Sequence, residues 1–217
     1  MPPEKRPAQP PPPRSKGPQR RDSRTPPPWS RVALIGGVAA LGLAAGVLAV
    51  VLLGGGGGGA GDQKSVAQAM TAAGCTTKTY ADQGQEHVAS YDAKVDYNSF
   101  PPTSGTHHQV PVIWGAYEEP VVLVQEVHNL EHGGVVIQYG DKVDASTRAQ
   151  LRAFYDGSPN GMLLAPLPKL GKKIALTAWT QLATCTSFDE DAFKAFQSAY
   201  RGNGPERHPI GDMQPGT

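Results

Sequence analysis

The longest hydrophobic stretch of the chain runs from Val32 to Leu53 and holds 22 residues without a charged or polar side chain. As a helix rising about 1.5 Å per residue it would extend about 33 Å, enough to cross a hydrocarbon core of roughly 30 Å. The pattern predicts one transmembrane helix. The alternative is a cleaved signal peptide, but its apolar region usually spans about 7–15 residues, and the leader that precedes Val32 is long for one.

The segments on either side of this stretch predict its orientation. Residues 1–31 are rich in proline and hold eight lysines and arginines against two acids, a composition typical of a disordered basic tail. The positive-inside rule places this tail in the cytoplasm and the rest of the chain outside. A basic tail can also bind nucleic acid, but the adjoining membrane span argues against that role. A glycine-rich linker over 54–61 then follows.

Beyond the linker, short apolar runs alternate with polar segments. Valine-rich and isoleucine-rich runs predict short strands. These strands are expected at Val121–Val127, Val135–Tyr139, Met162–Ala165 and Ile174–Trp179.

Three segments have the apolar spacing of helices. The first is Gln63–Ala73, and the second begins at the cap Asp144 and runs to about Tyr155. The third begins after a capping box formed by Ser187 and Glu190. The mixture predicts an α+β fold over 62–210, with a mixed or antiparallel sheet, about three peripheral helices and a disordered C-terminus over 211–217.

Charge divides the chain into two unlike parts. Residues 62–217 hold 12 lysines and arginines against 17 aspartates and glutamates, so their net charge is −5. An acidic domain argues against nucleic acid as a partner and favours cations, including metal ions.

The two cysteines, Cys75 and Cys185, both lie in this acidic part. In an oxidising compartment a single widely spaced pair predicts a disulfide bond. A metal ligand or a redox thiol is the alternative, although the pair lacks the CxxC spacing of such sites.

Five of the six histidines lie between His87 and His132. Four of them stand in two compact phrases, Pro101-Pro102-Thr103-Ser104-Gly105-Thr106-His107-His108 and His128-Asn129-Leu130-Glu131-His132-Gly133-Gly134. Neutral imidazole is a good ligand for transition metals and a proton carrier near neutral pH. The cluster therefore marks where chemistry would take place.

The phrase from His128 to His132 matches H-x-x-E-H, the pattern of inverted zincin proteases. That mechanism requires a helix, because only the i, i+4 spacing on a helix turns both histidines toward one zinc ion. Here β-branched residues precede the phrase and two glycines follow it, which predicts a turn between strands. We therefore do not expect a protease.

A metal site remains the leading hypothesis. His107, His128 and His132 would supply three imidazoles to copper or zinc, and Glu131 would orient a ligand or act as a base. Met162 is a candidate soft ligand for copper. The other histidines, His87, His108 and His208, are expected to be ordinary surface or turn residues.

Two further hypotheses stay open. In one, the histidines only support the fold of a non-catalytic cell-envelope module that binds another protein. In the other, Glu131 and a histidine act as base and acid in a hydrolytic enzyme, which requires a cleft around them.

The motifs of the outer domain resemble a bacterial membrane-anchored family catalogued as domain of unknown function 3105. The resemblance rests on the two histidine phrases and on the motifs Gly115-x-Tyr117, Leu164-Ala165-Pro166-x-Pro168, Ala175-Leu176-Thr177-Ala178-Trp179 and Gly204-Pro205-Glu206. It implies a basic N-terminus and a membrane span, but no activity.

Overall fold

A computed structural model describes residues 60–217. The cytoplasmic tail, the transmembrane helix and most of the linker that the sequence predicts lie outside the described residues. The α-helices are α1 (Ala60–Ala72), α2 (Leu123–Glu131), α3 (Ala145–Gly157) and α4 (Glu190–Tyr200). The strands are β1 (Thr76–Thr79), β2 (His87–Val88), β3 (His107–His108), β4 (Gly115–Ala116), β5 (Val135–Tyr139), β6 (Met162–Pro166), β7 (Ile174–Ala178) and β8 (Gln181–Cys185). Two short 3-10 helices are η1 (Pro168–Leu170) and η2 (Ile210–Asp212).

The centre of the domain is a six-stranded mixed sheet in the order β1-β8-β7-β5-β6-β4. Strands β5, β6 and β4 are parallel neighbours, with α3 in the connection from β5 to β6, and the other pairs are antiparallel. Strands β2 and β3 form a separate parallel pair. The predicted α+β fold is confirmed, and of the two sheet types that the sequence left open, mixed or antiparallel, the sheet is mixed.

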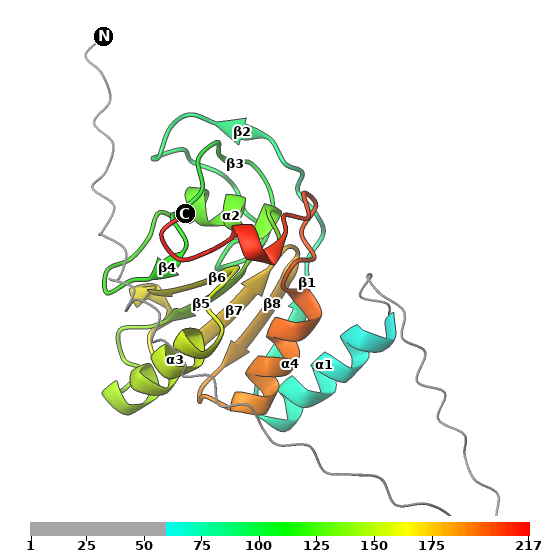
Figure 1. Cartoon of the computed structure of the whole chain (residues 1–217), viewed down its shortest axis with the longest axis vertical. Coiled ribbons are helices and arrows are strands. Elements are labelled where there is room, and N and C mark those ends of the chain that lie inside the picture. The colour runs from blue at the N-terminus through cyan, green and yellow to red at the C-terminus, as the bar shows by residue number, and fades with distance from the viewer. Residues whose placement is uncertain (1–59) are drawn as a thin grey trace, which may run out of the picture. The chain divides into compact units, whose positions relative to one another are not determined.

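Helices cover both faces of the sheet (Figure 1). On one face, α1, α3 and α4 pack over one core that includes Ile137 and Phe193. On the other face, α2 packs over a second core that includes Val136 and Leu163. Ile137 and Val136 are adjacent in β5 and belong to different cores, as expected because successive side chains of a strand point to opposite faces. The domain therefore has three layers, and α2 is alone on its face among the described α-helices.

The segment Val121–Val127, predicted to be a strand, instead leads into helix α2. Its β-branched residues favour strands, but that preference is weak and packing overrides it. Val127 and Leu130 are completely buried at helical spacing in the second core, and Val124 is nearly so. The described residues thus form four α-helices, and α2 is buried along almost its whole length and is not a peripheral helix.

Two predicted boundaries also differ from the structure. Helix α1 begins at Ala60, inside the expected linker. The cap of α4 is Asp189, whose carboxylate accepts the Ala192 N–H at 2.9 Å, and not Ser187. No helix in the described part of the chain is long and apolar enough to span a membrane.

The C-terminal segment 211–217, expected to be disordered, is instead part of the fold. Met213 is buried in the second core. The Trp114 N–H donates to the Thr217 carbonyl and the Gly216 N–H donates to the Trp114 carbonyl, both at 2.9 Å. One buried side chain and two backbone bonds fix a segment whose composition alone suggests a loose end.

Cys75 and Cys185 form the predicted disulfide bond. Both half-cystines are buried in the core that α1, α3 and α4 share. The bond joins the residue before β1 to the last residue of β8, so it ties one edge of the sheet on the face opposite α2.

Candidate metal centre

Helix α2 places two of the candidate residues on one face. His128 and Glu131 are three residues apart, so their side chains lie on the same side of the helix. Val127 and Leu130 fix the helix against the sheet, and the Asn129 side chain donates to and accepts from the Val112 backbone at 2.8 and 2.9 Å. The helix is buried along almost its whole length, and this holds His128 and Glu131 in place.

The short strands β2 and β3 bring two more histidines to this helix. They pair in parallel with His87 opposite His107, and the His107 N–H donates to the Glu86 carbonyl at 2.8 Å. The His107 ring also meets the edge of Trp179, with ring centroids 6.3 Å apart. His87, 20 residues earlier in the chain, is thereby placed at the site.

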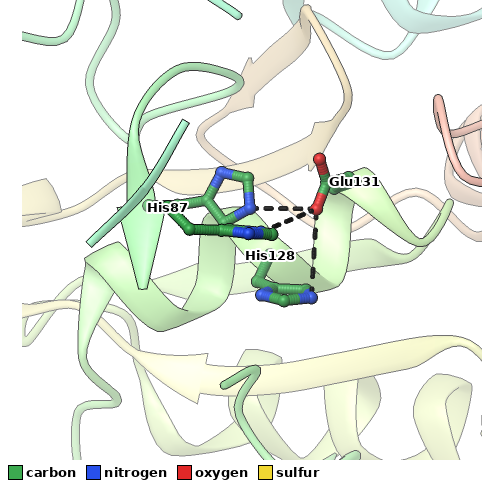
Figure 2. Close-up of side chains that lie close together, drawn as sticks. His87, His128 and Glu131 are labelled. Atoms are coloured by element: carbon green, nitrogen blue, oxygen red, sulfur yellow. Dashed lines mark hydrogen bonds and ion pairs between the residues drawn. The ribbon is translucent and has the colours of Figure 1, made fainter. Parts of the chain in front are cut away.

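These four side chains form what we call the inner group: His87, His107, His128 and Glu131. One oxygen of Glu131, Oε2, lies 2.9 Å from Nε2 of His107, 3.5 Å from Nε2 of His87 and 3.9 Å from Nε2 of His128. Figure 2 shows the contacts converging on this oxygen, with the rings of His87 and His128 stacked. Three imidazoles thus surround one carboxylate oxygen.

Backbone carbonyls determine which ring nitrogens of His107 and His128 carry hydrogen. Nδ1 of His107 lies 2.8 Å from the Gly105 carbonyl oxygen, and Nδ1 of His128 lies 2.8 Å from that of His108. A carbonyl oxygen only accepts, so we assign the hydrogen to Nδ1 in both rings. In the neutral rings Nε2 keeps its lone pair on the side of Glu131. A metal-binding histidine is commonly oriented by such a bond from its other nitrogen.

The inner group therefore brings together hydrogen-bond acceptors, namely the Glu131 carboxylate and the Nε2 lone pairs of His107 and His128. Such a set requires a positive charge between its members. The carboxylate of Glu131 is 1 % exposed and the side chain of His107 is completely buried. Burial is the largest influence on His128 and lowers the pKa of that ring, so it is neutral near pH 7. A carboxylate oxygen beside imidazole lone pairs is stable only with a proton or a metal ion between them. The geometry suits either one.

A second cluster, the outer group, begins where α2 ends and consists of His132, Glu206 and His208. Oε2 of Glu206 lies 3.1 Å from Nε2 of His132 and 3.2 Å from Nε2 of His208. The rings of His132 and His208 have centroids 3.9 Å apart. Nε2 of His132 also lies 3.0 Å from Nε2 of His128, so the two groups are contiguous.

Glycine residues allow the chain around Glu206 to reach the end of α2. The Glu206 N–H donates to the Glu131 carbonyl at 3.1 Å, and the Gly202 N–H donates to the Gly133 carbonyl at 2.7 Å. A Cβ atom at Gly204 would lie 2.2 Å from the Glu131 carbonyl oxygen. Only glycine permits this approach, which places Glu206 beside His132.

The candidate residues from the sequence divide between the two groups. His107 and His128 belong to the inner group, whereas His132 lies in the outer group. Glu131, expected to orient a ligand or act as a base, lies at the centre of the inner group as a possible ligand itself. Met162 is completely buried among apolar side chains of the core beneath α3, so it does not belong to either group.

Two of the histidines expected at the surface or in turns, His87 and His208, belong to these groups. His108 is structural: it accepts the Val110 N–H at 3.0 Å and contacts the Ala89 carbonyl at 3.1 Å. Its own carbonyl orients His128, as described above. Sequence spacing gives no sign of the β2–β3 pairing that brings His87 to the site, whereas Glu206 stands in one of the motifs that carry the family resemblance.

His128 lies on a helix and not on the turn that the sequence predicts, so the stated reason for excluding a zincin-like site is wrong. The site still differs from a protease site. Helix α2 ends at Glu131, so His132 is the residue that caps it. The carboxylate of Glu131, the base in that mechanism, is buried and faces imidazoles. The general base of that mechanism must reach a water molecule beside the substrate, whereas the Glu131 carboxylate is 1 % exposed.

A family model described as "Protein of unknown function (DUF3105)" matches residues 87–211, which is more than half of the chain. The chain belongs to this family. The DUF3105 match begins at His87 and extends past His208, so it includes every residue of the inner and outer groups. No curated protein and no solved structure matches the chain.

Proposed function

We propose that this DUF3105 domain binds a divalent transition metal through His87, His107, His128 and Glu131. The observation that carries the proposal is the convergence of three imidazole Nε2 atoms on one buried carboxylate oxygen. A zinc ion holds its ligands at about 2.0–2.2 Å, so tetrahedral ligand atoms are about 3.3–3.6 Å apart. The distances from Glu131 Oε2 to the three nitrogens run from 2.9 to 3.9 Å and need only small adjustments.

The donor set favours zinc or copper(II) over copper(I). Three imidazoles and one carboxylate are ligands for borderline divalent ions, whereas copper(I) prefers thiolates and thioethers. Among the described residues no cysteine is free, and Met162 lies in the apolar core. The hydrogen bonds from Nδ1 of His107 and His128 would fix both ligands before the ion arrives.

Zinc titration of the full-length, chelator-treated chain tests the proposal, with calorimetry and metal analysis as readouts. Glu131→Gln should weaken binding at least tenfold, because it removes the only carboxylate of the inner group. The matched control is Glu126→Gln, the same change at another buried position of α2, where one oxygen of the carboxyl group accepts a hydrogen bond from the Gln138 amide. Absence of zinc binding in the wild type, or equal affinity in Glu131→Gln, would contradict the proposal.

The same proposal places the domain outside the cytoplasm, anchored through Val32–Leu53. Two observations support it: the length of the apolar run and the disulfide bond, which persists in oxidising compartments. Protease treatment of intact cells would test it. Loss of the folded domain with a protected N-terminal tail is expected, and full protection of the domain would contradict it.

A further inference from the structure

Two sets of side chains have the same composition, and each has one member close to Nε2 of His128. Each set has two histidines and one glutamate, and in each set both imidazoles approach a single carboxylate oxygen. The inner set is His87, His107 and Glu131. In the outer set, Oε2 of Glu206 contacts Nε2 of His132 and of His208. His132 and Glu206 also lie close enough to His128 and Glu131 for these four to share an ion. Two histidines with one carboxylate are sufficient to hold a divalent transition metal and to leave positions open.

The two sets differ in their access to solvent. In the outer set the side chains of Glu206 and His208 are 43 % and 42 % exposed, and that of His132 is 17 % exposed. In the inner set only His87 is exposed, and its ring is stacked on His128. An ion from solvent meets a complete set of donors at the outer group, whereas the inner donors are mostly covered.

His128 connects the two sets. Its Nε2 atom lies 3.0 Å from Nε2 of His132 and 3.9 Å from Oε2 of Glu131. The hydrogen bond from Nδ1 of His128 to the His108 carbonyl fixes the orientation of the ring. When an ion leaves the outer set, Nε2 of His128 can replace one of its outer ligands. The same nitrogen can stay bound to the ion when the ion reaches the inner set.

The contacts of Nε2 of His132 also favour a cation. This atom lies 3.0 Å from Nε2 of His128 and 3.1 Å from Oε2 of Glu206. A ring nitrogen carries at most one hydrogen, so it cannot donate to both neighbours. A metal ion bound by His132 and Glu206 would satisfy both atoms at once.

We infer that His132, Glu206 and His208 form a second, outer site for the same divalent cation and that it loads the inner site across His128. The inference rests on the proposed function of the inner group. It adds a second binding site and a route by which an ion reaches the inner one. Ligand exchange moves the ion without any change in its oxidation state. The outer site is the more exposed and therefore the faster to exchange.

Zinc itself is the probe for the test, and the full-length chain is the sample. Equilibrium dialysis should give two zinc ions per wild-type chain, one of which a competing chelator removes much faster than the other. The combined Glu206→Gln and His208→Asn changes should reduce this to one ion and slow loading of the remaining site at least tenfold. Both side chains are more than 40 % exposed, so we expect the variant to fold. Glu190→Gln, an exposed glutamate paired with Lys194 on α4, is the control and should behave as wild type.

The outcomes separate the two proposals. One ion in the wild type, with unchanged stoichiometry and loading rate in the outer variant, would overturn the outer site and leave the inner site standing. No ion in the wild type would overturn both. One ion that is lost in the outer variant but kept in Glu131→Gln would overturn the assignment of the inner site and, with it, the loading path.

Discussion

Nε2 of His107 lies 2.9 Å from Oε2 of Glu131, and both side chains are at most 1 % exposed. The two residues are 24 positions apart and come from β3 and α2. The local sequence around each residue does not by itself bring the two side chains together. The contact forms only when α2 packs against the sheet and β3 lies next to α2. His87 and His128 contact the same carboxylate oxygen of this buried pair.

Zinc should stabilise the folded domain. An ion that binds only the native state at a free concentration of about 100 times its Kd raises the free energy of unfolding by about 2.7 kcal/mol. We expect this rise in urea titrations of the wild type and of Glu126→Gln, and a much smaller one in Glu131→Gln. If the histidines only support the fold, zinc will leave the urea midpoint of all three proteins unchanged.

His87→Asn should weaken zinc binding at least tenfold with little effect on the stability of the metal-free protein. His87 is 44 % exposed and its Nε2 lies 3.5 Å from Glu131, so its removal takes away a ligand without opening the core. Calorimetric titration measures the affinity and thermal unfolding measures the stability. Gln109→Ala, at an exposed position just after β3, is the control. Equal zinc affinity in the two variants would exclude His87 as a ligand.

The contribution of Glu126 to the stability of the metal-free protein should fall as the pH rises from about 4.5 to about 8. Burial raises the pKa of this carboxyl from 4.5 to about 8. The folded chain therefore keeps a proton that the unfolded chain releases, so this contribution is full below the unfolded pKa and is lost as pH rises through the folded one. Glu126→Gln has no such proton and should lose this part of the slope.

Urea unfolding at about pH 5 and about pH 8, in the presence of a chelator, measures this effect. Glu126→Gln should gain stability relative to wild type at the higher pH by several kcal/mol, since one pKa unit corresponds to about 1.4 kcal/mol. Parallel pH profiles for the two proteins would show that Glu126 does not titrate in this range.

Removal of the disulfide bond should lower stability without altering metal binding by the folded protein. The bond closes a loop with a sequence separation of 110 residues, which the chain-entropy model values at about 4–5 kcal/mol. Cys75 and Cys185 lie in the core on the face opposite α2, remote from the inner group. Guanidinium unfolding of the double serine variant measures the loss, and zinc titration without denaturant should give the wild-type affinity. A loss of zinc affinity in the folded variant would show that the two regions are coupled.

The sequence predicts much of the sheet because short Val and Ile runs bounded by turns are typical of buried strands. The predicted run Val135–Tyr139 is strand β5 itself, and Asp144 caps α3 as expected. The predicted strand Val121–Val127 is wrong, because its residues favour a strand while the packing of the segment in the fold favours helix α2. Val124, Val127 and Leu130 have the spacing of a helix, but the β-branched residues of this segment favour a strand. Only the folded structure shows that the segment is buried on several sides, which decides for the helix.

The site was only partly predictable for a similar reason. His107, His128 and Glu131 stand in compact phrases that indicate chemistry without any knowledge of the fold. His87 reaches them through a two-residue parallel pairing, and Glu206 reaches His132 because Gly204 allows close contact with the end of α2. Pairing and close approach are properties of the folded chain, so local sequence does not reveal them.

Crystals of the full-length chain grown with zinc and measured at the zinc absorption edge test the central claim most directly. We predict an anomalous peak about 2.0–2.2 Å from Oε2 of Glu131 and from the Nε2 atoms of His87, His107 and His128. Crystals without zinc at this position, with His107 still bonded directly to Glu131, would contradict it.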